Sequence, residues 1–153
     1  MDRNFIITEY DQKLEFRLFA FLEKCLPESG RALDLNGRHS FYKDIHGHFD
    51  VFLCMKDGET IIGTVAVRLM NDKDCELKSL YLLEKYRGLG LGRKLLETAV
   101  RYAADIGYER MYLDSLSTSK RALKLYRMAG FTDTEKYNDS IFSDVFMVLE
   151  LRR

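Results

Sequence analysis

The spacing of apolar residues divides this chain into strands and helices. Leu14, Leu18, Leu22 and Cys25 recur at the helical period, which predicts an amphipathic helix over residues 11–26. Two apolar runs flank Asp57-Gly58, a dipeptide that favours the tight turn of a β-hairpin. The second half of the chain alternates strand-like and helix-like segments, which indicates β-α-β crossings.

The predicted order of elements describes one mixed sheet. In chain order we expect a strand at 5–10, a helix at 11–26 stopped by Pro27, a short helix within 40–48, strands at 51–55, 60–69 and 75–82, a helix at 90–106 ended by Gly107, a strand at 110–116, a helix at 120–129 capped by Ser117-Thr118-Ser119, and strands at 131–137 and 141–151. This order predicts an α/β fold whose mixed sheet carries helices on both faces. With 153 residues and no linker or repeat, residues 1–153 are expected to form a single domain.

The most informative stretch is Tyr86-Arg87-Gly88-Leu89-Gly90-Leu91-Gly92-Arg93, between a predicted strand and a predicted helix. Glycine lets the backbone adopt positive φ and approach a ligand closely. The first N–H groups of a helix lack partners, and the helix dipole favours negative charge there. With Arg87 and Arg93 at its rim, the turn predicts an anion site, for which a pyrophosphate is the simplest ligand. By itself, such a turn is also consistent with a plain connection between a strand and a helix.

The spacing of the glycines excludes two common phosphate loops. The Walker pattern G-x-x-x-x-G-K-[ST] fails because Arg93 stands five residues after Gly88. The dinucleotide pattern G-x-G-x-x-G fails because Arg93 occupies the place of its third glycine. The pattern that fits is R-x-x-G-x-G, made by Arg87, Gly90 and Gly92.

Together with the preceding Leu80-Tyr81-Leu82, this pattern resembles the acetyl-coenzyme A (acetyl-CoA) loop of the GNAT N-acetyltransferase superfamily. Three further segments resemble the family in the right order: the strand Glu76–Leu82, the late helix Ala122-x-x-Leu125-Tyr126-x-x-x-Gly130-Phe131, and Tyr137-Asn138 before the last strand. The resemblance covers residues from about 59 to the C-terminus, and the earlier half matches in element order alone. It implies the GNAT fold, an about seven-stranded, mixed, mostly antiparallel sheet with helices on both faces.

The resemblance also implies acetyl-CoA as the acyl donor. Amides of the glycine turn would bind its pyrophosphate, and its pantetheine arm would lie like an added strand where the strand of Leu80 splays from that of Asp114. A backbone N–H near Leu80 or Leu82 would face the thioester oxygen. One departure is Glu84-Lys85, where many relatives carry a proline. The residues implied to hold acetyl-CoA are Leu80, Tyr81, Leu82, Arg87, Gly88, Leu89, Gly90, Leu91, Gly92, Arg93 and, before the late helix, Ser119.

Two residues are implied to carry the chemistry. Relatives place a tyrosine at the position of Tyr126, where a phenol would protonate the leaving thiolate; packing in the apolar face of its helix is the competing interpretation. Glu76 is the candidate base, since an ammonium group with a pKa near ~10.4 does not lose its proton readily at pH 7. Strand alternation places Glu76 on the face of Lys78, Leu80 and Leu82 unless a bulge intervenes. For Glu76 the competing interpretation is an ion pair with Lys78.

The composition excludes several other classes of protein. The 24 basic and 24 acidic residues balance, which argues against a nucleic-acid binder. No apolar run approaches the ~18 residues of a membrane span, so no membrane partner is expected. Cys25, Cys54 and Cys75 form no C-x-x-C pair, which predicts reduced thiols and a cytoplasmic location. His46-Gly47-His48 lacks a third partner at metal-ligand spacing, so we expect no metal site.

The implied function is acetyl-CoA-dependent N-acetylation of a small amine, an amino acid or a protein amine, by direct attack in a ternary complex. A non-catalytic acyl-CoA sensor on the same fold remains an alternative, as does transfer of another acyl group or transfer to an oxygen. A homodimer is common in the family, so a second copy is a candidate partner. The charge of the acceptor is open, because acidic residues (Glu28, Asp34, Asp44 and Asp50) and basic residues (Arg31, Arg38 and Lys43) share the variable first half.

Overall fold

The computed structural model describes residues 4–151. Its strands are β1 (Phe5–Glu9), β2 (Val51–Asp57), β3 (Thr60–Leu69), β4 (Asp74–Leu82), β5 (Arg110–Ser115), β6 (Thr132–Asp133) and β7 (Val145–Glu150). Its α-helices are α1 (Glu15–Glu28), α2 (Ile45–His48), α3 (Leu91–Ile106) and α4 (Lys120–Met128), with 3₁₀ turns η1 (Gln12–Leu14), η2 (Ser40–Lys43) and η3 (Glu84–Tyr86).

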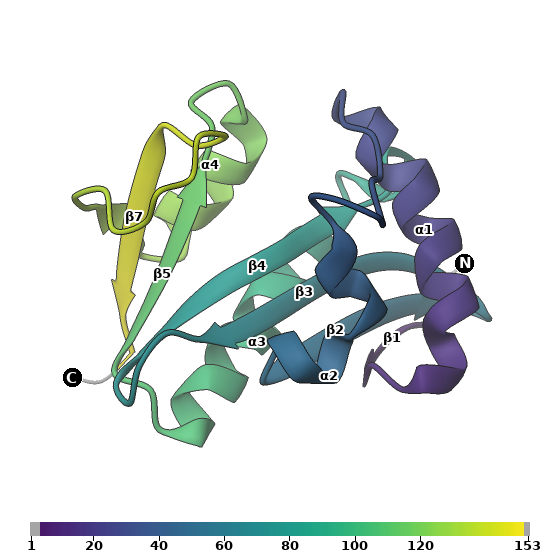
Figure 1. The fold of residues 1–153 in the computed structure, drawn as a ribbon, viewed down its shortest axis with the longest axis horizontal. Coiled ribbons are helices and arrows are strands. Elements are labelled where there is room, and N and C mark those ends of the chain that lie inside the picture. The colour runs from purple at the N-terminus through teal and green to yellow at the C-terminus, as the bar shows by residue number, and fades with distance from the viewer. Residues whose placement is uncertain (1–3, 152–153) are drawn as a thin grey trace.

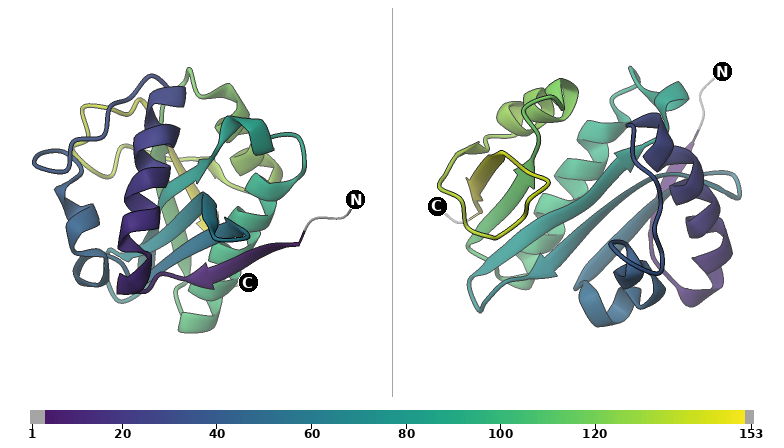
Figure 2. Two further views of the ribbon diagram at one scale, coloured as in Figure 1. Left: turned by 90° about the vertical axis from the view of Figure 1, so that its right-hand side faces the viewer. Right: turned by 45° about the horizontal axis from the view of Figure 1, so that its top comes forward.

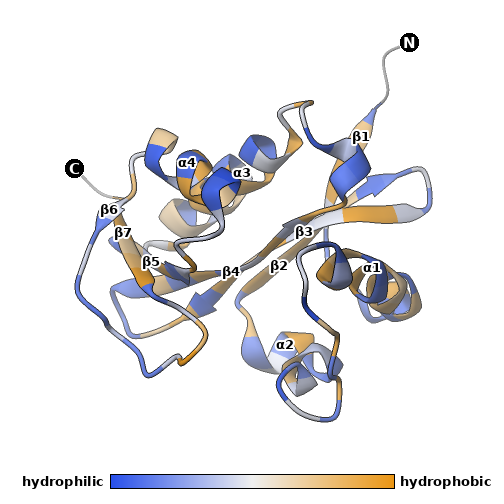
Figure 3. Cartoon of the chain, turned by 90° about the horizontal axis from the view of Figure 1, so that it is seen from above, coloured by the Kyte–Doolittle hydropathy of each residue, from blue (hydrophilic) through white to orange (hydrophobic). Residues whose placement is uncertain are grey.

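The strands form one seven-stranded sheet in the order β1-β2-β3-β4-β5-β7-β6 (Figure 1). Every pairing is antiparallel except that of β4 with β5, which is parallel. Helices α1 and α2 cover one face, and α3 and α4 cover the other (Figure 3). The predicted mixed, mostly antiparallel sheet with helices on both faces is therefore confirmed.

Both faces of the sheet are packed with apolar side chains. Helix α1 buries Leu18 and Leu22, while α3 buries Leu95 and Leu96 against β3 and β4. Helix α3 approaches the sheet so closely that β3 needs a glycine at Gly63: an added Cβ would stand 2.9 Å from Leu95 Cδ1 and 3.1 Å from the Tyr81 carbonyl oxygen. This packing fixes the beginning of α3 next to the end of β4.

The sheet opens between β4 and β5. These strands pair only from Asp74–Glu76 to Arg110–Tyr112, although both continue beyond the ladder. Past that point they diverge, and the β5–β7 unit leans away from the rest of the sheet (Figures 1 and 2). The expected splay between the strand of Leu80 and the strand of Asp114 is thus present in the structure.

A β-bulge changes the predicted facing of β4. Its register against β3 shifts between Thr64 and Ala66, and Ser79 adopts a left-handed φ of 54° at this point. Ala66 pairs with Lys78 and Thr64 pairs with Tyr81, so Lys78 and Tyr81 share a face. Leu80 and Leu82 were expected to share the face of Glu76 and Lys78 unless a bulge intervened; the bulge is present, and its extra residue puts the two leucines on the opposite face.

Two predicted helix ends also need correction. Pro27 does not stop α1, which continues through it to Glu28. Ser29 caps the helix, and the chain then turns at Gly30, which adopts a φ of 78° and lets the Arg31 N–H bond back to the Leu26 carbonyl at 3.0 Å. The predicted cap of α4 is wrong as well, since Ser119 stands at the cap position but makes no side-chain cap hydrogen bond.

The remaining differences lie in short segments. The helix expected within 40–48 is divided into the 3₁₀ turn η2 and the single turn α2. The strands expected at 131–137 and 141–151 shrink to β6 and β7. The chain between them leaves the sheet because its polar side chains bond to buried carboxylates of β4 and β5, as described below.

Candidate functional site

The glycine turn leads into α3 with its backbone exposed. Gly88 and Gly90 adopt φ angles of 85° and 77°, and an added Cβ at either would meet open space. The Lys94 N–H makes the hydrogen bond to the Gly90 carbonyl, at 3.1 Å. The preceding N–H groups of the first turn have no acceptor within the helix, as is general for helix N-termini. The turn can therefore offer several amides and the positive end of a helix dipole to an anion.

The other residues expected to hold acetyl-CoA surround this turn unevenly. Arg87 and Leu89 are exposed, and Leu91 is buried in the core. Arg93 is exposed, but its Nε donates to Glu97 at 2.7 Å, which offsets part of its charge. Gly92 lies where an added Cβ would contact Leu125 of α4 at 3.6 Å, so the turn is next to the late helix.

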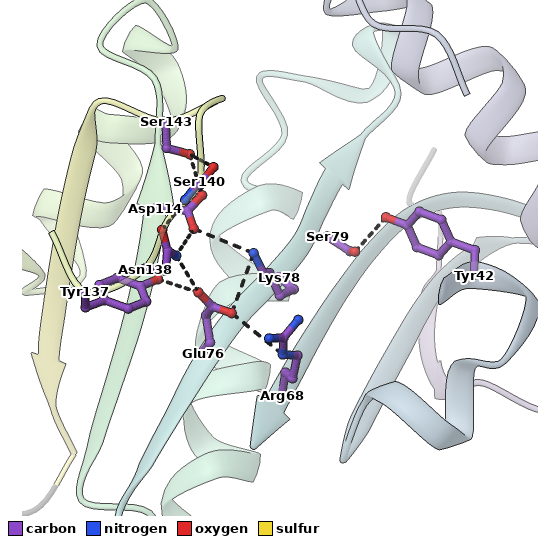
Figure 4. A network of polar contacts seen from close by, with 10 residues as sticks. All are labelled: Tyr42, Arg68, Glu76, Lys78, Ser79, Asp114, Tyr137, Asn138, Ser140 and Ser143. Atoms are coloured by element: carbon purple, nitrogen blue, oxygen red, sulfur yellow. Dashed lines mark hydrogen bonds and ion pairs between the residues drawn. The ribbon is translucent and has the colours of Figure 1, made fainter. Parts of the chain in front are cut away.

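Polar side chains gather where β4 and β5 part (Figure 4). Glu76 is 4% exposed, and its Oε2 accepts hydrogen bonds from the Tyr137 hydroxyl at 2.5 Å and from Asn138 Nδ2 at 3.4 Å. Its Oε1 faces Lys78 Nζ at 3.6 Å and Arg68 Nε at 3.9 Å. The contacts expected if Glu76 forms an ion pair are thus present. Among residues 4–151, hydrogen bonds are donated to Oε2 but not to Oε1.

A second carboxylate, Asp114 of β5, completes this network. Asp114 accepts hydrogen bonds from Ser143 at 2.6 Å and from Asn138 at 2.7 Å, and Lys78 Nζ lies 3.7 Å away. Burial alone would raise the pKa of Asp114, but the bonds from Ser143 and Asn138 and the charge of Lys78 together hold this pKa below its ordinary value. Asn138 therefore links Asp114 to Glu76 across the opening.

Tyr126 is buried on α4, with its ring edge-on to Phe131 at 5.9 Å between centroids. Burial raises the pKa of Tyr126; Tyr81 adds to the rise, Arg31 opposes it, and Asp114 adds to it. Burial is thus the main reason that the phenol of Tyr126 holds its proton. It stays protonated at neutral pH, as a proton donor must.

The cysteines and histidines do not form a reactive centre. Burial raises the pKa of Cys75 to about 12, which makes its thiol a poor nucleophile. His39 is buried, and its Nδ1 accepts the Asp34 N–H at 3.0 Å. Within residues 4–151, no three histidine, cysteine, aspartate or glutamate side chains are grouped to hold a metal ion.

No helix in this range combines the length and apolar character needed to cross a membrane.

The sequence pattern does not indicate two of the residues at the site. Asp114 lies within a strand-like run that carries no motif, and only the topology brings it to Glu76. Tyr42 lies far away in sequence, yet its hydroxyl is 2.7 Å from Ser79 Oγ in the bulge of β4. The sequence gives little sign of Tyr42, because a tyrosine in a segment without regular periodicity is more simply interpreted as a core residue.

Comparison with known proteins relates this chain to acetyltransferases. The family model described as "Acetyltransferase (GNAT) family" matches residues 15–131. An uncharacterized N-acetyltransferase of Schizosaccharomyces pombe is 38% identical over 96 residues, which are 61% of this chain and 59% of that protein. The chain spans between 38% and 59% of the length of the first curated relatives that it matches.

Solved structures share the whole fold. A GNAT-family acetyltransferase of Staphylococcus aureus superposes with a TM-score of 0.87 at 19% identity, covering 97% of this chain and all of that one. A putative acetyltransferase of Salmonella typhimurium, solved with its cofactor acetyl-CoA, superposes with a TM-score of 0.73 at 20% identity, covering 98% of this chain and 95% of that one. At these identities the likeness shows the fold.

Proposed function

Since this chain belongs to the acetyltransferase (GNAT) family, we propose that it is an acetyl-CoA-dependent N-acetyltransferase that acetylates a primary amine by direct attack in a ternary complex. The observation that carries this proposal is the opening between β4 and β5 beside the glycine turn of α3. The part of β4 that does not pair with β5 offers backbone groups for a strand-like ligand, and the glycine turn offers the amides at the start of α3. A molecule with a diphosphate and an extended amide-containing arm would match both features, and acetyl-CoA, with which the Salmonella typhimurium neighbour was solved, is such a molecule.

In the proposed reaction, the amine nitrogen forms a bond to the thioester carbonyl carbon, and the carbon–sulfur bond breaks. Glu76 takes the proton of the ammonium group at Oε1, directly or through water. Backbone amides near Leu80 and Leu82 stabilise the negative charge that develops on the carbonyl oxygen. Tyr126 donates its phenolic proton to the departing sulfur, and the second proton that the nitrogen loses on becoming an amide returns to the Tyr126 phenolate through water, while Glu76 releases its proton to solvent. The proposal is supported by the buried carboxylate of Glu76 where β4 and β5 part, and by the protonated phenol of Tyr126 on α4, the helix that adjoins the glycine turn.

Binding and turnover have to be measured separately, because a sensor on this fold would bind without reacting. Acetyl-CoA is titrated by calorimetry, and free coenzyme A release is followed with a thiol reagent across a panel of amines. The proposal expects saturable binding and a steady, amine-dependent release, with an acetylated amine identified by mass spectrometry. Binding without release would indicate the sensor, and no binding at millimolar acetyl-CoA would overturn the proposal entirely. A cytoplasmic location and a homodimer stay predictions.

A further inference from the structure

A cleft lies beside the opening, between the segment after α1 and the loop before β7. Its lining residues are Ser29, Gly30, Arg31, Arg38, Leu116 and residues 141–144. Ser143 belongs both to this cleft and to the polar network, since its hydroxyl donates to Asp114 Oδ1 at 2.6 Å. The cleft therefore adjoins the place where the proposed acyl transfer would occur.

Two arginines give this cleft its charge. Within residues 4–151, neither the Arg31 nor the Arg38 guanidinium is within 4.0 Å of a carboxylate. The Arg38 guanidinium carbon lies 3.7 Å from the centroid of the Phe142 ring, a stacking contact that orients the group without neutralising it. Among the described residues that line the cleft, Asp144 is the one acid, and Ser117 already donates to both of its oxygens at 2.7 Å.

Arg31 also acts on the proposed proton donor. Burial raises the pKa of Tyr126, and the positive charge of Arg31 opposes that rise. In the same way, Arg31 opposes the effect of burial on the pKa of Tyr42, which contacts the bulge of β4. Arg31 also lines the same cleft as Ser143, whose hydroxyl donates to Asp114 at 2.6 Å, so a group bound to Arg31 lies in the cleft that adjoins the polar network.

The other charged residues of the variable first half do not line the cleft. Glu28 Oε1 accepts the Glu84 N–H at 2.9 Å, and Asp50 accepts a bond from the Tyr108 hydroxyl on another part of the sheet. Lys43 Nζ donates to Asn36 at 2.9 Å. The remaining two acids interact within their own turns: Asp34 with the Arg38 N–H, and Asp44 with His48. Of the charged residues in the first half, the two that line the cleft are therefore basic, which favours an acceptor with a negative group over one with an additional positive group.

We propose that the acceptor is a primary amine that carries a carboxylate, bound by Arg31 and Arg38, with an apolar body against Leu116 and Phe142. This inference rests on the proposed N-acetyltransferase function. The planar guanidinium fork matches the geometry of a carboxylate, and such charge-assisted bonds are stronger than neutral ones. Leu116, Phe142 and the neighbouring Ile141 supply the apolar part of the lining. Amino acids with apolar side chains combine these features.

The test compares amines that differ only in the carboxylate. Leucine is paired with isopentylamine and phenylalanine with phenethylamine, and phosphoethanolamine tests whether a phosphate serves in place of the carboxylate. We expect the KM of each amino acid to be about tenfold or more below that of its decarboxylated partner. In Arg38→Ala and Arg31→Ala the ratio of the two KM values should fall toward one, and Arg38→Lys should restore part of it. Lys43→Ala, which removes a cation of the same segment outside the cleft, should leave the ratio unchanged.

The outcomes separate this inference from the function on which it rests. Acetyl transfer without a preference for the carboxylate-bearing amine overturns the inference but not the proposed function. The same holds if Arg31→Ala and Arg38→Ala raise the KM of both amines in a pair equally. A preference for phosphoethanolamine over the amino acids also overturns it. If no amine is acetylated, the proposed function fails; calorimetric titration of the acetyl-CoA-saturated protein with leucine and isopentylamine then decides the carboxylate question by binding alone.

Discussion

Tyr126 is the residue that we propose donates the proton to the leaving sulfur. Replacing it by phenylalanine removes the hydroxyl and keeps the packing on Phe131, so we expect kcat to fall by about 10²–10⁴-fold with little change in the Kd of acetyl-CoA. Because burial raises the pKa of Tyr126, the phenol stays protonated throughout the neutral range, and its ionisation should not lower the rate below about pH 10. Steady-state kinetics and calorimetry check this, with Tyr102→Phe on α3 as the control. An unaltered kcat would remove the assigned role.

Glu76 requires a variant that keeps shape and removes charge. Glu76→Gln should lower the rate about 10²–10⁴-fold at pH 7, and the remaining rate should increase with pH as the free amine becomes more abundant. Asp74→Asn is the matched control, since Asp74 is also a buried carboxylate of β4 and pairs with Arg110 at 2.9 Å. Both changes should lower the thermal midpoint. If the two variants lose activity equally, the contribution of Glu76 is structural.

At this scale, the sequence could indicate residues within a motif but not residues assembled by topology. Tyr126 and Gly90 stand in patterns that can be recognised along the chain. Asp114 and Ser143 are brought to Glu76 only because β5 lies next to β4 and the loop before β7 folds over both. The side chains that surround a carboxylate decide its chemistry, and for Glu76 they come from three separate segments.

Among the elements, the glycine turn carries the binding proposal. In Gly90→Ala the φ of 77° would be strained by about 1–2 kcal/mol, and the turn would relax away from its open form. Gly58→Ala supplies the matched control, because Gly58 has a φ of 62° in a hairpin and also has open space around it. The two variants should lose similar unfolding free energy in urea. Only Gly90→Ala should weaken acetyl-CoA binding, by about tenfold in a calorimetric titration.

Most elements follow from local patterns, and those that do not have identifiable reasons. Apolar periodicity and turn residues locate α3, β5 and the β2–β3 hairpin within a few residues. The bulge at Ser79 leaves no mark in the sequence, since a serine in the left-handed region is fixed by its partners: Tyr42 contacts its hydroxyl and Thr64 donates to its carbonyl at 2.7 Å. The lost length of β6 likewise reflects tertiary bonds of Tyr137 and Asn138 that override local β preference.

In the whole molecule, the network around Asp114 joins the two parts of the sheet. The pKa of Asp114 is below its ordinary value, so its ionised form contributes stability above about pH 4, and this contribution is lost as pH falls through the lowered pKa. Asp114→Asn should therefore be less stable than the wild type at pH 7, and the difference should shrink below about pH 4. Urea unfolding across this range measures it. Asp139→Asn, an exposed change in the loop that supplies Asn138 and Ser143 to Asp114, should show no such trend.

The wedge between β4 and β5 has a further consequence for the empty protein. Beyond Glu76 and Tyr112, each strand presents an inner border that the other does not cover. Backbone amides along such a border exchange their hydrogens with solvent deuterium far sooner than those of a closed ladder. Acetyl-CoA lying in the wedge would act as a surrogate strand, slowing isotope uptake along the second half of β4 while the interior of α3 stays as it was. Bound acetyl-CoA would thus supply the backbone partners that β5 does not provide to the second half of β4.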